Sequence, residues 1–279
     1  TLGQFLYDTP YNTSETLTLV MRDDDLLQVQ AYAALGIDAK SVFLAVDEGL
    51  ARAVADNQRA SEIPRSKPLP VDTYIPDTLQ SEMELYTIDM HAGLINFKFL
   101  EPVDRASLDL SGVILQTDVN VLSVDGGYEC RNVDPDACVQ LSLVNTEAKL
   151  LDVPCVPTNV SSTNNSVTTW TLQCLNTTTV EDALWLNISL GPTNLNAIKA
   201  HYPLGSQEHL TNLALRSPIA SDRGGNAFLT INLMPEMALE PASWIGDRNW
   251  PLLTAFNVDM DAGTIALTFN ETVNANELD

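Results

Sequence analysis

The sequence contains one passage twice, and this repetition constrains the fold more than any other feature. The segment DMHAGLINFKFLEPVDRASLD begins at Asp89, and its relative DMDAGTIALTFNETVNANELD begins at Asp259, 170 positions later (259 − 89). They align without a gap, so that Gly93 matches Gly263. RDDDLLQVQAYAAL and GPTNLNAIKAHYPL repeat with a spacing of 169 (195 − 26, between their leucines). Self-similarity at a fixed spacing indicates a chain built from repeated structural units.

The repeat extends to a third pair of segments, AVADNQRA and PIASDRGGNA, where Asp56 matches Asp222 at a spacing of 166 (222 − 56). Loops absorb a three-residue difference easily. We interpret the chain as the tail of one repeat, one full repeat and the head of a third. Because the sequence opens without Met, we expect the polypeptide to continue at both ends; alternatively, the head of one chain completes the tail of the next. The predicted boundaries are a C-terminal half-repeat at 1–64, a linker at 65–83, a complete repeat at 84–234, a linker at 235–250 and N-terminal strands at 251–279.

Alternation of apolar and polar residues predicts strands in both copies of the passage. In TIALTF and LINFKF, Ile, Leu and Phe alternate with smaller or polar residues, which is typical of a half-buried strand. An alternating run precedes each, so the D-A-G and H-A-G links predict antiparallel hairpins with Gly93 and Gly263 at positive φ. Further strands are predicted at 111–118, 137–145, 168–175 and 182–190, a spacing typical of a β-sandwich.

A short helical turn interrupts the strands at PTNLNAIKAHY. Polar residues at its start can cap free backbone N–H groups, and apolar residues three apart can face the core. We expect this turn to carry the chain from one sheet to the other. The predicted caps are Thr193 or Asn194 and, in the earlier copy, Asp24 or Asp25; the predicted core-facing residues are Leu195, Ile198, Leu26 and Val29.

The charge balance excludes two classes of partner. The chain has 37 acidic and 14 basic residues, a net charge of −23. Such a surface repels phosphate backbones and anionic lipid headgroups, so neither nucleic acid nor a membrane surface is an expected partner. No run of about 18 apolar residues occurs, so no membrane span is expected in this segment.

The cysteines and glycosylation sequons predict an extracellular protein. Four cysteines allow three pairings, and proximity favours Cys130–Cys138 and Cys155–Cys174. Free buried thiols are the alternative; zinc fits poorly because no C-x-x-C pair is present. Three N-x-[ST] sequons crowd the 159–176 stretch, where TNVSSTNNSVTTW (158–170) is predicted to be an exposed polar loop. Together these features predict a secreted, disulfide-containing protein with N-linked glycans. The six candidate glycosylation sites are Asn12, Asn159, Asn164, Asn176, Asn187 and Asn270.

The repeated motifs resemble those of a known kind of domain. LTAFNVDMDAGTIALTFNETVNANELD, the D/N-L-x-x-I/V-K/Q-A turn and IASDRGGN resemble an Ig-like repeat found in tandem in large secreted or cell-surface proteins of protists and algae. The first half is also similar to bacterial S-layer-type Ig-like domains. The resemblance covers most of 17–63, 84–118, 180–232 and 251–279 and is weaker over 119–179, which has the character of an insertion. It implies an all-β fold of tandem Ig-like antiparallel β-sandwiches with short helical crossover turns.

Residues able to support chemistry are few. Asp259 and Asp261 form an Asp-x-Asp-x-Gly that could bind Ca²⁺, but the chain enters a strand at once and the earlier copy has His91 in place of the second Asp. The alternative is that Asp259 stabilises a tight turn through its own backbone. The three histidines form no catalytic motif, so we predict no catalytic residues, no enzymatic activity and no required cofactor.

The predicted function is structural. The resemblance implies adhesion, spacing or filament building outside the cell, and the flagellar hairs (mastigonemes) of algae and stramenopiles are one plausible setting. We therefore expect a structural glycoprotein of an extracellular filament, appendage or surface layer, whose partners are copies of itself or neighbouring repeats. The first alternative is a carbohydrate- or calcium-dependent adhesin, in which Trp170 or Trp185 could line a sugar platform. The second is a non-catalytic module of a secreted enzyme.

Overall fold

The structure, a computed structural model, consists mostly of β-strands in several small sheets, together with the helices α1 and α3. The chain divides into two compact units, residues 1–79 with 222–226 and residues 80–221 with 227–279, which are described separately. The residues described are 6–7, 16–32, 35–53, 55–80, 82–118, 121–124, 127–130, 140–144, 148–151, 155–161, 168–174, 183–215, 217–228 and 238–275.

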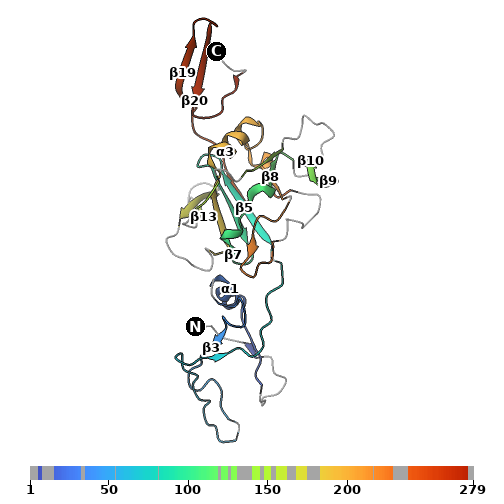
Figure 1. Ribbon diagram of the computed structural model, residues 1–279, viewed down its shortest axis with the longest axis vertical. Helices are drawn as coiled ribbons and strands as arrows, with labels where there is room; N and C mark the ends of the chain where they lie inside the picture. Colours follow the sequence, from blue (N-terminus) through green and yellow to red (C-terminus); the bar gives the residue numbers. More distant parts are fainter. Residues whose placement is uncertain are drawn as a thin grey trace. The chain divides into compact units, whose positions relative to one another are not determined.

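The second unit is built around two sheets that share one hydrophobic cluster (Figure 1). The larger has the strand order β12-β15-β6-β5-β18 and the smaller has the order β11-β8-β16. These strands are β5 (Met83–Asp89), β6 (Leu94–Phe99), β8 (Val113–Gln116), β11 (Gln140–Ser142), β12 (Lys149–Leu150), β15 (Trp185–Ser189), β16 (Asn212–Leu215) and β18 (Ser243–Ile245).

Two-stranded pairings account for the other strands of this unit. Helix α3 (Gly191–Ala200) lies in the described part of this unit, and short 3₁₀ turns occur at Arg105–Ser107, Leu110–Gly112 and Glu208–Leu210. The pairs are β7 (Val103–Asp104) with β17 (Ser221–Asp222), β9 (Val121–Val124) with β10 (Gly127–Cys130), β13 (Cys155–Ser161) with β14 (Thr168–Cys174), and β19 (Leu253–Asp259) with β20 (Thr264–Phe269).

The predicted β5–β6 hairpin is confirmed, and local chemistry explains its turn. Gly93 has φ +66°, a backbone conformation that side chains disfavour. The Asp89 carboxylate accepts hydrogen bonds from the backbone N–H groups of His91 (2.9 Å) and Ala92 (2.8 Å). The turn therefore satisfies two amides that have no ladder partner.

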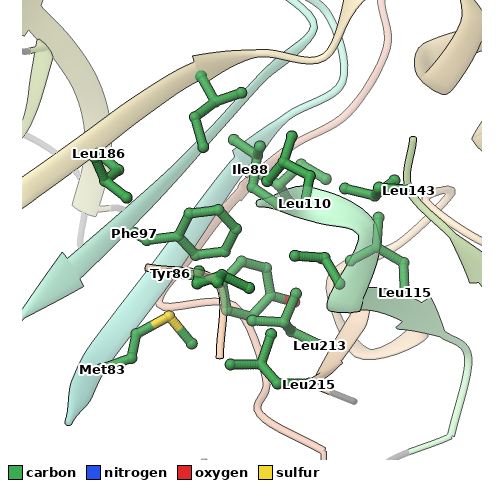
Figure 2. Close-up of a cluster of buried hydrophobic side chains, with 14 of the residues drawn as sticks. Met83, Tyr86, Ile88, Phe97, Leu110, Leu115, Leu143, Leu186, Leu213 and Leu215 are labelled. Atoms are coloured by element: carbon green, nitrogen blue, oxygen red, sulfur yellow. The ribbon is translucent and has the colours of Figure 1, made fainter. Parts of the chain in front are cut away.

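The core lies between the larger and the smaller sheet (Figure 2). Tyr86 and Phe97 come from the β5–β6 hairpin, Leu186 from β15, and Leu115 and Leu213 from the smaller sheet. The Tyr86 hydroxyl, although buried, donates a hydrogen bond to the carbonyl of Thr211, so its polar atom has a partner. Burial, reinforced by Glu240 and Glu208, raises the pKa of Tyr86 well above its ordinary value, so the phenol stays protonated and remains a donor.

Most of the predicted strands are present, but β5 and β6 are more buried than the alternation predicted. Thr87, Asn96 and Asn187 lie opposite one another on the face away from the core, yet all three are buried. The Asn96 amide donates to the Thr87 hydroxyl at 2.9 Å. Side chains of a strand that has neighbouring strands on both sides are partly covered by the side chains of those neighbours. The alternation of apolar and polar residues within one strand does not reveal this covering.

Two predicted features of the organisation differ in detail. The segment 235–250, predicted to be a linker, contains β18, which pairs in parallel with β5 at the edge of the larger sheet. The segment 158–170, predicted to be an exposed loop, contributes backbone to β13 and to the start of β14, its antiparallel partner, and β14 itself confirms the strand predicted at 168–175. Both strands of that pair contain Thr, Val or Trp among polar residues, a composition compatible with pleated backbone.

The helical turn at 192–202 is a full helix, but its predicted caps are wrong. Helix α3 begins at Gly191, and neither Thr193 nor Asn194 is the N-cap. Asn194 is instead buried inside the helix, where its amide nitrogen donates to the carbonyls of Leu190 (2.8 Å) and Val144 (2.9 Å). Its carbonyl oxygen accepts from the Val144 N–H at 2.9 Å. Asn194 therefore fastens the helix to the segment that follows β11.

The first unit contains helix α1 and two small strand pairs. Helix α1 (Asp23–Ala31) follows the N-cap residue Arg22, so the predicted caps Asp24 and Asp25 are likewise wrong. Asp25 is buried and pairs with the guanidinium of Arg22 at 3.3 Å. The sheets are β1 (Leu6–Tyr7) with β2 (Leu19–Val20), and β3 (Phe43–Leu44) with β4 (Leu69–Pro70).

The β19–β20 hairpin repeats the geometry of β5–β6 without its burial. Gly263 has φ +63°, and the Asp259 carboxylate accepts from the N–H groups of Asp261 (3.0 Å) and Ala262 (2.9 Å). Ile265 is 66% exposed, whereas Ile95, at the same place in the first hairpin, is 0% exposed. Turn chemistry therefore sets the shape of both hairpins, while only the first is packed.

No helix in the described part of the chain is long and apolar enough to cross a membrane.

The paired isoleucines give a matched test of this difference. We expect Ile95→Ala to destabilise the second unit by about 2–5 kcal/mol, because it leaves a cavity in a packed core. Ile265→Ala, the control, should change stability by less than about 0.5 kcal/mol. Urea unfolding of dilute protein, followed by circular dichroism, measures both. Equal losses for the two variants would contradict the packing described here.

Candidate functional site

The principal polar cluster is a junction at which three separate segments meet. The Lys199 ammonium lies 2.7 Å from Asp247 Oδ2 and 2.5 Å from Glu271 Oε2. Lys199 is in the last turn of α3, Asp247 follows β18, and Glu271 follows β20. We call these three residues the junction cluster. It joins the body of the second unit to the β19–β20 hairpin.

Neighbouring hydrogen bonds reinforce the junction cluster. Asp247 also accepts from the Asn249 N–H at 3.0 Å, and the Asn249 amide donates to the His91 carbonyl at 3.2 Å. The Thr272 hydroxyl donates to the Asn196 carbonyl on α3 at 3.1 Å. Lys199 is also well placed, since a cation near a helix C-terminus interacts favourably with the helix dipole.

The electrostatics of the junction cluster favour its charged form. Burial by itself lowers the pKa of Lys199, but hydrogen bonds and charge attraction from Asp247 and Glu271 outweigh it, so the pKa is raised. Burial likewise raises the pKa of Asp247, but the hydrogen bonds from the Lys199 ammonium and the Asn249 backbone N–H outweigh it, so that pKa is lowered. Both groups therefore remain ionised throughout the neutral range.

The first unit contains a counterpart of this ion pair. Gln30 precedes Lys199 by 169 positions (199 − 30), and Asp77 precedes Asp247 by 170 (247 − 77). The Gln30 amide donates to Asp77 Oδ2 at 3.1 Å. The same two places in the repeat are therefore in contact in both units, with a neutral amide replacing the ammonium in the first.

A second contact also recurs in both units. The Trp244 indole N–H donates to the Gly205 carbonyl at 3.3 Å, and the Tyr74 hydroxyl donates to the Gly36 carbonyl. Both glycines have positive φ, +74° and +75° respectively. A Cβ at Gly205 would lie 2.7 Å from Ile198 Cγ2, closer than atoms approach without rearrangement. In both units the aromatic side chain therefore donates to the carbonyl of a glycine whose positive φ other residues rarely adopt.

Sequence reasoning missed these contacts, although a signal was present. TYIPD (73–77) and SWIGD (243–247) align at a spacing of 170 (243 − 73) and contain both the aromatic donor and the acidic residue. Each member taken alone is an ordinary surface residue. Only the alignment of the two copies shows that they recur together.

The predicted glycosylation sites lie in different environments. Asn270 is exposed, and its side-chain carbonyl oxygen accepts a hydrogen bond from the Leu252 N–H at 2.7 Å. This bond does not use the side-chain nitrogen, which is the atom that carries an N-linked glycan. Asn187 is 1% exposed on β15 between β12 and β6, so the folded sheet has no room for a glycan there. Asn159 lies on β13. Asn12, Asn164 and Asn176 lie outside the described residues.

The predicted disulfides can be compared with the backbone register. Cys155 and Cys174 are direct partners across the β13–β14 pair. Opposed residues of an antiparallel pair have Cα atoms about 4.5–5.5 Å apart, within the range that a disulfide bridges. Cys130 ends β10, and its predicted partner Cys138 lies outside the described residues. Both pairings stay predictions.

The residues considered for metal and sugar binding have structural surroundings. The Asp259 carboxylate accepts hydrogen bonds from the turn amides, as predicted by the alternative to calcium binding, in which this residue stabilises a tight turn. Asp261, beside it, is exposed. Calcium binding at this pair stays a prediction. Trp185 is buried beneath Lys98, whose ammonium lies 5.9 Å from the ring centroid, so it cannot contribute to an exposed sugar platform. Trp170 lies on β14.

No protein-family model, no curated protein and no solved structure matches this chain.

We expect Lys199→Met to release the β19–β20 hairpin from α3. The change leaves two carboxylates facing each other, and hydrogen bonds to charged groups contribute about 1.5–3 kcal/mol. Hydrogen exchange of the hairpin amides, including that of Asn270, which donates to the Leu252 carbonyl, measures the release. Lys98→Met is the control, because its partner Glu84 lies away from the junction. Unchanged exchange in Lys199→Met would contradict a holding role for the cluster.

The same amides should show a defined pH dependence in the unmodified chain. The lowered pKa of Asp247 means that its contribution is complete above 3.8, the ordinary value, and is lost as pH falls through the lowered pKa. The raised pKa of Lys199 means that its contribution is complete below 10.5 and is lost as pH rises through the raised pKa. Protection should therefore be constant between these limits.

We expect Cys155 and Cys174 to be joined in protein from an oxidising compartment. Non-reducing peptide mapping by mass spectrometry should give a linked peptide pair that separates on reduction. The Cys155→Ser variant should lose that pair and retain a Cys130–Cys138 linkage. A peptide joining Cys130 to Cys155 or Cys174 would refute the pairing.

Proposed function

We propose that this chain is a structural glycoprotein, built from tandem Ig-like β-sandwich repeats, that forms part of an extracellular filament, appendage or surface layer. The recurrence of two contacts, each made once inside each unit's copy of the repeat, supports this function above other observations. An acidic residue, a long polar side chain, an aromatic donor and a positive-φ glycine recur at spacings of 169–170 and make equivalent contacts in both units.

Repeats that share one architecture can follow one another in a tandem array. Such arrays extend in one dimension, since each repeat touches only its neighbours. The junction cluster suits this role, because it joins the last turn of α3 to the hairpin with which the next copy of the repeated passage begins.

The Ig-like assignment has two lines of support. A five-stranded and a three-stranded sheet share one core, and all of their pairings are antiparallel apart from β18 with β5. Two inner faces with alternating apolar residues are typical of a β-sandwich. The second line is the resemblance of the repeated motifs to tandem Ig-like repeats.

We assign no catalytic role to the junction cluster. Lys199 is bound on both sides by carboxylates, and its raised pKa keeps it from acting as a base near neutral pH. These features suit a structural contact. The placement outside the cell is inferred from the cysteines and sequons and from the register of Cys155 with Cys174.

Electron microscopy of the protein isolated from its native source tests this function. We expect a filament or a regular layer whose period corresponds to one repeat or a multiple of it. Digestion with an N-glycosidase should lower the mass of the subunit without dissolving the array. Native material consisting only of dispersed single molecules would overturn the proposal.

A further inference from the structure

The first unit brings two carboxylates close together, those of Asp77 and Asp222. Both residues belong to this unit, although 145 positions separate them in the sequence (222 − 77). A carboxylate oxygen of one lies within 4.8 Å of a carboxylate oxygen of the other. Two oxygens that bind one Ca²⁺ at about 2.3–2.6 Å are at most about 5 Å apart. The two side chains therefore have the spacing of two ligands of a single cation.

Asp222 carries a buried negative charge that has no positive partner in the described structure. The residue is only 5% exposed, and its carboxylate accepts hydrogen bonds from the backbone N–H (2.8 Å) and the side-chain amide (2.9 Å) of Asn226. Both donors are neutral. The adjacent Arg223 makes no ion pair with any residue that the structure describes. A buried charge is costly unless an opposite charge or a metal ion accompanies it.

Asp77 likewise has only neutral donors among the described residues. Its carboxylate accepts from the Gln30 side-chain amide at 3.1 Å and from the Leu79 N–H at 3.1 Å. The Asn226 amide, which donates to Asp222, also donates to the backbone carbonyl of Asp77 at 3.2 Å. Asn226 therefore holds the two aspartates beside each other without neutralising either of them.

The second unit has a cation at the corresponding place of the repeat. There the Lys199 ammonium lies between two carboxylates, 2.7 Å from Asp247 and 2.5 Å from Glu271. The counterpart of Asp247 is Asp77, and the counterpart of Lys199 is Gln30, whose amide is neutral. The first unit thus also has a second carboxylate beside Asp77, but its side chains supply no positive charge in place of the ammonium.

The Gln30 side chain offers a third oxygen. Its amide oxygen is buried and makes no hydrogen bond with any described residue, whereas its nitrogen lies 3.1 Å from Asp77 Oδ2. The two ends of an amide have nearly the same shape, so half a turn about the last bond exchanges them. The oxygen then lies about where the nitrogen was, and neighbouring oxygens around Ca²⁺ are about 3 Å apart. A bound cation would thus give the buried oxygen a partner.

From these observations we infer that Asp77, Asp222 and Gln30 bind a divalent cation, Ca²⁺, in the place that the Lys199 ammonium has in the second unit. The three side chains offer oxygen atoms alone, which are the ligands that Ca²⁺ prefers, whereas zinc prefers nitrogen and sulfur. Water molecules complete the roughly six to eight oxygens that Ca²⁺ takes. The site goes beyond the proposed structural function and does not depend on it.

Calorimetric titration of the EDTA-treated 279-residue chain with CaCl₂ tests the site. Sodium chloride at about 0.15 M screens the diffuse attraction of Ca²⁺ to a surface of net charge −23. We expect saturable binding with a Kd of about 10⁻⁴–10⁻³ M, the range of extracellular calcium-binding modules. Asp222→Asn should weaken this binding by at least about tenfold. Asp247→Asn, the matched control, removes the same charge from the second unit and should leave the binding unchanged.

Gln30→Lys is the decisive variant, because it keeps both carboxylates and supplies the ammonium that the second unit has. It should fold, as judged by circular dichroism, and should no longer bind Ca²⁺; it also decides the matter if Asp222→Asn fails to fold. Binding that persists in Gln30→Lys would overturn the inference, as would a parent chain with no saturable binding up to about 10 mM Ca²⁺. An equal loss in Asp247→Asn would indicate general attraction to an acidic surface, and a loss confined to Asp261→Asn would place the ion at the β19–β20 turn; either result would also overturn it.

Discussion

The burial of the β5–β6 hairpin is the interaction on which the rest of the second unit depends. The hairpin occupies the middle of the larger sheet, and its apolar face meets the smaller sheet across the core. Hydrophobic burial contributes roughly 25 cal/mol per Å². The same hairpin at the other end of the chain has the same turn and no such burial. Local chemistry is thus sufficient for the shape of the hairpin, whereas its place in a domain requires partners.

Features with local determinants could be predicted from the sequence. The hairpins follow from alternation, from an aspartate that binds its own turn amides and from Gly93 and Gly263. Features with distant determinants could not. Asn194 is a residue type that commonly caps helices, but here its side chain bonds to the backbone of Val144, fifty residues away (194 − 144). β18 is three residues long and pairs with a strand far earlier in the chain, so its own residues predict nothing about the pairing.

The junction cluster belongs to the second class. Lys199, Asp247 and Glu271 are separated widely in sequence, and each resembles a solvated surface charge. In a chain with 37 acidic residues and 14 basic ones, one lysine shared by two carboxylates also relieves repulsion that would otherwise keep two segments apart. Alignment of the two copies of the repeat shows that the acidic residue Asp247 recurs as Asp77, and the structure shows the contact that each of them makes.

The first unit has Gln30 where the second has Lys199, and this difference has a consequence for how the two contacts respond to salt. An ammonium shared by two carboxylates resists displacement through ionic attraction, which dissolved salt weakens; an amide bound to one carboxylate depends far less on salt. The Lys199 contact should therefore weaken as ionic strength rises, whereas the Gln30 contact should change little. A single position of the repeat thus decides whether this contact responds to salt, without any change in the fold around it.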